Sequence, residues 1–175
     1  MNVGALFGIS ILMCFLSFGI ITRFYIWPRI RSMNPREALV PLVVVHTTRF
    51  VGLCFLVPGV ASESLPSGFA SPAGYGDLIA AVLAVIAIWT LTARISWALP
   101  FVWIFNVWGA TDLLNAFYQG EIHYHINPGW LGAAYFIPTV IVPPLLVTHG
   151  LIFWLLLHSR RSNVVPALEN GPKSA

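Results

Sequence analysis

Five long apolar stretches, separated by short polar connections, constrain the fold of this chain more than any other feature. Each is rich in Leu, Val, Ile, Phe and Ala and has roughly the 20 residues that a helix needs to cross a bilayer. None alternates strictly between apolar and polar residues, as the strands of a membrane β-barrel do. We predict an all-α integral membrane protein, a five-helix transmembrane bundle over residues 1–158. The expected spans are approximately Gly4–Tyr25, Leu39–Val57, Tyr75–Thr92, Trp97–Tyr118 and Trp130–Leu157.

The composition excludes several other classes of protein. Of the 175 residues, 58% are hydrophobic and 9% are charged, against about 25% charged in typical soluble chains. Such a chain is not a nucleic-acid binder, a disordered segment or a secreted disulfide scaffold. Cys14 and Cys54 lie inside apolar stretches without the spacing of a metal or redox site. We expect a multi-pass protein of the plasma (inner) membrane, with the lipid bilayer as its surroundings and no nucleic acid as partner.

The basic residues predict an orientation. They gather in the first and third connections and in the C-terminal segment, whereas the second and fourth connections have none. Because Lys and Arg mark the cytoplasmic side of short connections, the N-terminus is expected outside and the C-terminus in the cytoplasm. Residues 61–76 should then form an external loop, and residues 159–175 a disordered cytoplasmic tail. The basic residues in question are Arg29, Arg31, Arg36, Arg94, Arg160, Arg161 and Lys173.

Four ionisable residues fall inside the predicted spans, namely His46, Arg49, Asp112 and His149. An ionisable group in hydrocarbon costs about 2.5–3.5 kcal/mol on insertion scales, so each of these requires a partner or a function. Arg49 cannot lose its proton and lies near the predicted midplane, close in height to Asp112. We therefore predict an Arg49–Asp112 ion pair, which is either a structural clamp or part of a ligand or proton site. With Asn115 these four residues form a predicted polar seam.

The two histidines suggest an alternative. At about 1.5 Å per residue, His46 and His149 lie roughly 10 and 12 Å from the inner ends of their spans, in nearly the same layer. Two histidines at matched depth can supply both axial ligands of one b-type haem, with Arg49 meeting a propionate. They can equally be hydrogen-bonded residues of the core, because matched depth does not establish ligation.

The last span contains three prolines, Pro138, Pro143 and Pro144. Each proline removes a backbone donor, so this helix should bend and leave carbonyl groups free. Broken helices of this kind line substrate sites in transporters, although many are static kinks.

A short motif in the fourth connection, EIHYH, offers a candidate metal site. In an extended segment Glu121, His123 and His125 would point the same way, and imidazole with carboxylate suits Zn²⁺ or Cu²⁺. A fourth ligand is not evident, although Asp77, expected at a helix mouth, lies on the same side. Loop histidines are more often simply solvated.

Three functions remain open from the sequence. The protein binds or translocates a small hydrophobic or amphipathic ligand in an intramembrane pocket; or it is a bis-histidine haem protein for electron transfer; or it is a structural or accessory subunit. The corresponding partners are a small apolar ligand, haem, and further copies of the chain or a larger membrane complex. No nucleophile–base pair or pair of carboxylates at chemical spacing is visible, so the sequence does not indicate an enzyme.

Overall fold

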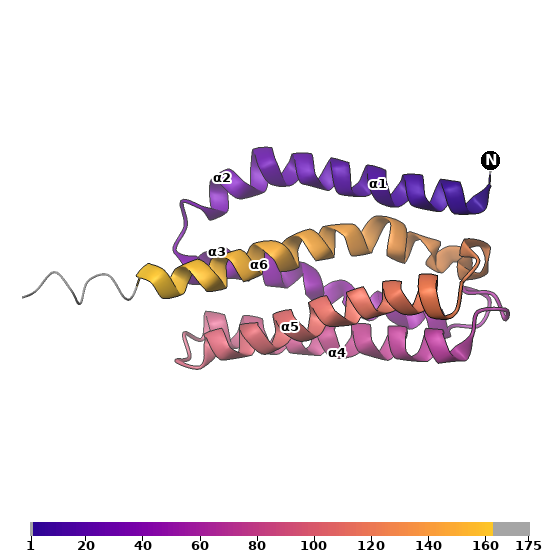
Figure 1. The fold of residues 1–175 in the computed structure, drawn as a ribbon. Helices are drawn as coiled ribbons and strands as arrows, with labels where there is room; N and C mark the ends of the chain where they lie inside the picture. The colour runs from indigo at the N-terminus through magenta and orange to yellow at the C-terminus, as the bar shows by residue number, and fades with distance from the viewer. Residues whose placement is uncertain (1, 163–175) are drawn as a thin grey trace, which may run out of the picture.

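A computed structural model describes residues 2–162, which form long helices joined by short connections (Figure 1). Several helices change their winding part-way, so that π- and 3₁₀-helical segments continue or precede α-helices. The elements in chain order are α1 (Val3–Ile21), η1 (Thr22–Ile26), α2 (Trp27–Ile30), α3 (Pro35–Val44), η2 (Val45–Leu56), α4 (Ser67–Thr92), α5 (Ala98–Tyr118), η3 (Gln119–His123), η4 (Pro128–Tyr135), η5 (Ile137–Ile141) and α6 (Val142–Ser162).

Four helical segments are long and apolar enough to cross a membrane: Val3–Ile30, Pro35–Leu56, Ser67–Thr92 and Ile137–His158. They correspond to the first, second, third and fifth predicted spans. The fourth predicted span is the helix α5, which has 21 residues but a lower hydropathy, because Asn106, Asp112 and Asn115 interrupt its apolar sequence. The described chain is thus a helical bundle of the membrane type.

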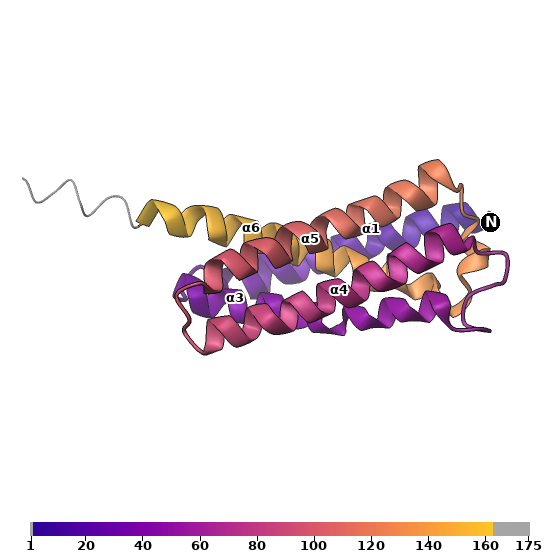
Figure 2. The ribbon, with the colours of Figure 1, turned by 90° about the horizontal axis from the view of Figure 1, so that it is seen from below.

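The connections collect at the two ends of the bundle (Figures 1 and 2). One end carries the N-terminus, the connection 57–66 between η2 and α4, and the segment from η3 to η4. The opposite end carries the α2–α3 turn, the α4–α5 turn and the C-terminal end of α6. The arginines of the first and third connections therefore lie at the same end. The predicted tail, residues 159–175, is helical up to Ser162, and residues 163–175 lie outside the described part of the chain.

The helix α4 begins at Ser67, not at Tyr75 as predicted, so residues 67–76 of the expected external loop are helical. Packing explains the difference. A buried stripe of mostly small residues continues along α4 in alternating steps of three and four, which is the spacing of a helix that packs closely on its neighbours. Phe69 extends this contact, since its ring packs against Phe55 with centroids 5.7 Å apart. The buried stripe comprises Ala70, Ala73, Asp77, Ala80, Ala84, Ala87 and Leu91.

The segment η2 is a 3₁₀-helix of 12 residues, although such runs rarely exceed four residues. The hydroxyl groups of Thr47 and Thr48 bond back to the carbonyls of Val44 and Val45, at 2.8 and 2.7 Å. A 3₁₀-helix has three residues per turn, so residues three apart are stacked in a straight line. The buried residues of η2 follow this rule: they are His46, Arg49, Gly52 and Phe55.

The predicted span 130–157 is not one helix. Gly132, which lies inside η4, has a φ of +55°, and the chain kinks there before it enters the π-helical η5. Pro138 lies within η5, and prolines 143 and 144 open α6, which agrees with the predicted break. One of the carbonyls freed by these prolines, that of Val140, accepts a hydrogen bond from Cys14 Sγ at 3.4 Å.

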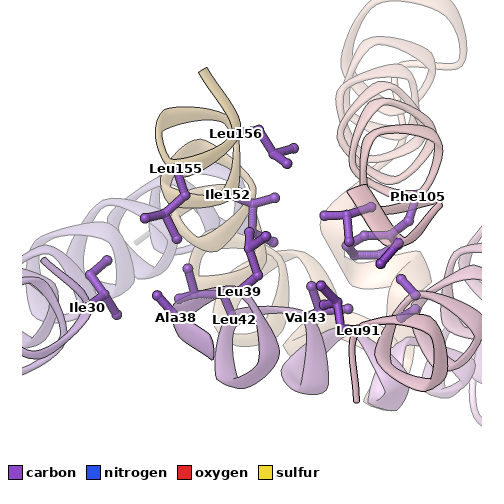
Figure 3. Packing of buried hydrophobic residues seen from close by; sticks show 14 residues of the cluster. Ile30, Ala38, Leu39, Leu42, Val43, Leu91, Phe105, Ile152, Leu155 and Leu156 are labelled. Carbon is purple, nitrogen blue, oxygen red and sulfur yellow. The ribbon is translucent and has the colours of Figure 1, made fainter. Parts of the chain in front are cut away.

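Two apolar clusters fill the bundle. The first, at the end of the α4–α5 turn, joins α3, α4, α5 and α6 around Leu39, Phe105 and Ile152 (Figure 3). The second joins η2, α4, α5 and the η4–α6 region around Phe55, Leu113 and Leu145. On each of η2, α4, α5 and α6, polar residues that are buried or, in the case of Asp112, half-buried lie between the two clusters. We call this set the polar layer; it comprises His46, Arg49, Asp77, Asn106, Asp112, Thr148 and His149.

The turn at Gly132 gives a first prediction. A side chain at this φ is strained, and a Cβ at Gly132 would overlap the carbonyl oxygen of Val60. We expect Gly132→Ala to lower the free energy of unfolding by about 1–3 kcal/mol, measured by thermal unfolding in detergent. The control is Gly150→Ala, where a Cβ meets no atom within 4 Å and a helical alanine should stabilise by about 0.5–1 kcal/mol. If Gly132→Ala and the wild type unfold at the same temperature, the backbone at Gly132 does not require a glycine and the prediction is wrong.

Candidate functional site

Arg49 is the centre of the polar layer and is 1% exposed. Its Nε donates to Asp77 Oδ1 at 2.7 Å, Nη1 donates to the Gly109 carbonyl at 3.0 Å, and Nη2 donates to Asp112 Oδ2 at 2.7 Å. The same Nη2 also lies 2.7 Å from Asp77 Oδ1. One guanidinium group therefore joins η2 to α4 and to α5. The ion pair between Arg49 and Asp112 that the sequence predicts is present.

Asp77 is the main residue of this site that sequence reasoning missed. It was expected at a helix mouth, because the helix was expected to start at Tyr75. In the structure Asp77 is buried and lies one heptad after Ala70 and one before Ala84, within the buried stripe of α4. This seven-residue spacing is visible in the sequence and could have assigned Asp77 to the interior.

The charges of the cluster do not balance when both carboxylates are ionised. Asp77 and Asp112 bring two negative charges to one guanidinium group. The two carboxylates differ in their environment, since the side chain of Asp77 is 9% exposed and that of Asp112 is 16% exposed. Asp112 is therefore the more accessible of the two.

Three glycines make room for the polar side chains. A Cβ at Gly52 would overlap the carboxylate of Asp77, and a Cβ at Gly76 would overlap that of Asp112. At Gly109 a Cβ would lie 2.7 Å from His149 Cε1 and 2.9 Å from Arg49 Nη1. The absence of a side chain at these positions allows charged groups from one helix to touch the backbone of the next.

His149 is held by Asn106, a residue that the sequence did not connect to the site. Nδ1 of His149 lies 2.7 Å from Asn106 Oδ1, and Asn106 Nδ2 donates to the His149 carbonyl at 3.3 Å. Because the amide nitrogen must face that carbonyl, Asn106 Oδ1 accepts a hydrogen bond from the N–H group at Nδ1. A neutral His149 then has its lone pair on Nε2, which is buried and has no hydrogen-bond partner among the described residues.

His46 lies against His149, with ring centroids 4.1 Å apart. Its Nε2 is 3.0 Å from Thr148 Oγ1, and its Nδ1 is the second buried imidazole nitrogen without a partner in the described chain. The prediction that the two histidines share a layer is confirmed.

This geometry does not fit a bis-histidine haem. Two axial imidazoles lie on opposite faces of the macrocycle, which separates them. The rings of His46 and His149 are in van der Waals contact, and Phe105 packs on both, with centroids at 5.1 and 5.5 Å. No space for a porphyrin remains between them, so the haem alternative is wrong for this arrangement.

A cavity that is open at one end extends from Asp77 and Asp112 towards the end of the bundle that carries the N-terminus. Its walls are mostly apolar, as is usual for ligand pockets, and come from α1, η2, α4, α5 and the η4–α6 region. A second, more polar cavity also reaches Asp112 and includes Asn115 and Gln119. The aromatic and acidic residues that line the first cavity are Phe7, Phe55, Phe69, Phe117, Asp77, Asp112 and Glu121.

The metal site predicted for Glu121, His123 and His125 is not formed. The prediction assumed an extended segment, but Gln119–His123 is helical and His125 has a φ of +46°. In a helix, residues two apart point to different sides. Within residues 2–162 no group of three or more His, Cys, Asp or Glu side chains is placed to hold a metal ion.

The fold and the site define a class: a small helical bundle of the membrane type, with an arginine ion-paired to two aspartates in its interior. The chain belongs to the family described as Domain of unknown function (DUF8737), whose model matches residues 6–157. No curated protein and no solved structure matches the chain.

The double ion pair gives a second prediction. Arg49→Leu leaves the buried carboxylate of Asp77 and the half-buried carboxylate of Asp112 without a partner, and breaking a buried pair costs about 3–5 kcal/mol. Arg49→Leu/Asp112→Asn should recover little, because Asp77 stays unpaired, whereas the further change Asp77→Asn should restore much of the yield. The measurement is the monodisperse fraction after detergent extraction, followed by size-exclusion chromatography. Full recovery already in the double variant would show that Asp77 contributes nothing to the cluster.

Proposed function

We propose that the protein binds or translocates a small hydrophobic or amphipathic ligand in a cavity inside the membrane. The single observation that carries this proposal is the position of the carboxylates of Asp77 and Asp112. They belong to the ion-pair network of Arg49 and at the same time line the floor of a mostly apolar cavity. A structural clamp alone needs no cavity at its carboxylates.

The broken helix supports the same proposal. Ile137, Pro138 and Val142, at the junction of η5 and α6, line the cavity. Single-turn π-helical segments occur frequently at functional sites, and helices interrupted by proline form the substrate sites of many transporters. The cavity thus lies where the backbone departs from regular winding.

The membrane orientation is part of the proposal. Five spans, including α5, would place the N-terminus and the cavity mouth outside and the basic connections in the cytoplasm of a cell bounded by its plasma membrane. The apolar cluster around Leu39 and Phe105 would then close the cytoplasmic half of the bundle. In this arrangement the cavity is reached from the outside.

The orientation has a direct test in a variant with Cys14→Ala and Cys54→Ala. A cysteine at the exposed Ser64 should react with an impermeant maleimide on intact cells. Cysteines at Ser32 and Ser96, which are also exposed, should react only after permeabilisation. The inverse pattern would reverse the orientation, and different sides for Ser32 and Ser96 would overturn the five-span count.

The cavity has its own test with a neutral, photoactivatable adamantyl diazirine. Mass spectrometry of the membrane-embedded protein should find labelled positions on the cavity wall, such as Leu113 and Phe117, and on the lipid-facing side of α1. Ala116→Trp fills the space shared by both cavities and should abolish the labelling of the cavity wall. The labelling of α1 should remain and serves as an internal control. Unchanged labelling of the cavity wall in Ala116→Trp would contradict a cavity that accepts ligands.

A further inference from the structure

We propose that the ligand is a lipophilic cation, an ammonium group on an apolar tail, whose charge binds beside Asp112. This inference rests on the proposed function and adds the chemical class of the ligand.

The first argument is the charge of the cluster. Arg49 donates to Asp77, to Asp112 and to the Gly109 carbonyl, so it is already committed to protein acceptors. One positive charge faces two carboxylates, and a net negative charge in an apolar interior is costly. A cation in the cavity would restore neutrality, while an anion would add to the imbalance.

The second argument is the lining of the cavity. Its ionisable residues are Asp77, Asp112 and, at the mouth, Glu121, all of which are acidic. Within the described part of the chain no Lys, Arg or His side chain lines this cavity, and Arg49 lies behind the two aspartates. In the second cavity, the ionisable residues other than Asp112 are His123, Tyr118 and Tyr124. The first cavity therefore offers acceptors of hydrogen bonds and negative charge at both its floor and its mouth.

The third argument is the unpartnered acceptor beside the cluster. His149 is 1% exposed, and its Nε2 has no hydrogen-bond partner in the described structure. Asn106 Oδ1 accepts a hydrogen bond from the N–H group at Nδ1, so the lone pair of the neutral ring is on Nε2. This nitrogen lies next to Gly109, against which Arg49 Nη1 also packs. The polar layer thus contains an unused acceptor behind the floor of the cavity, in addition to the surplus carboxylate; His149 itself lines neither cavity.

The fourth argument is the aromatic wall. Phe7, Phe55, Phe69 and Phe117 surround the approach to Asp112. The faces of aromatic rings attract cations, and the attraction increases in a site that excludes water. The same rings provide the apolar surface for a hydrocarbon or aryl tail.

Asp112 is the residue that we assign to the ammonium group. It accepts from Arg49 through Nη2, whereas Asp77 is contacted by both Nε and Nη2. Asp112 is also the more exposed carboxylate and lines both cavities. Replacing it by Asn leaves Arg49 paired with Asp77, a neutral pair that retains the link between η2 and α4.

The test compares three ligands of the same shape: 4-phenylbutylammonium, 4-phenylbutanol and 4-phenylbutyrate. Binding to the full chain in phosphatidylcholine nanodiscs is measured by equilibrium dialysis, with empty nanodiscs subtracting partition into lipid. We expect the ammonium compound to bind about tenfold more tightly than the alcohol, a difference of about 1.4 kcal/mol, and the carboxylate to bind more weakly than both.

Asp112→Asn should remove the preference for the ammonium compound and leave the affinity for the alcohol within about twofold, which also shows that the cavity is still folded. Glu63→Gln removes an exposed carboxylate outside the cavity and should retain the preference. Equal binding of ammonium and alcohol to the wild type, or a preference that survives Asp112→Asn, would overturn the inference while leaving the proposed function standing. If none of the three binds, the proposed function fails as well.

Discussion

The burial of one arginine governs the interior of this protein. Arg49 carries a positively charged guanidinium group, and it is 1% exposed in a bundle of apolar helices. Two carboxylates and a backbone carbonyl satisfy it, and each must approach within hydrogen-bond distance of the guanidinium group. The glycines at positions 52, 76 and 109 permit this approach. Helix spacing, the glycine positions and the location of the cavity floor all follow from the requirement to neutralise one guanidinium group.

Elementary energetics applied to the sequence predicts part of this arrangement. Because a charged side chain in hydrocarbon needs a partner, the sequence alone is enough to pair Arg49 with Asp112, and the two histidines that it places at similar depth lie in contact. The sequence does not assign Asp77 to the interior, because hydropathy places the ends of helices poorly when glycine, serine and proline interrupt the first turns. The buried stripe of α4 continues through those residues, and packing rather than hydropathy sets its length.

Depth in the membrane carries no information on lateral distance or on the direction of a side chain. For this reason the sequence can suggest a haem between His46 and His149, whereas the rings are in contact at 4.1 Å. The same limitation applies to the EIHYH motif, whose convergence depends on an extended backbone. The winding of η2 is not foreseen either, although the three-residue spacing of its buried residues and the Thr47–Thr48 pair are visible in the sequence.

The winding of η2 also determines a length. A 3₁₀-helix rises about 2.0 Å per residue and an α-helix about 1.5 Å, so 12 residues reach roughly 6 Å further in the first form. That distance is about one α-helical turn, and it carries Phe55 to its position against Phe69 on the cavity wall. If the same residues were wound as an α-helix, Phe55 would stop one turn short. The pitch of η2 therefore sets the position of this part of the cavity wall.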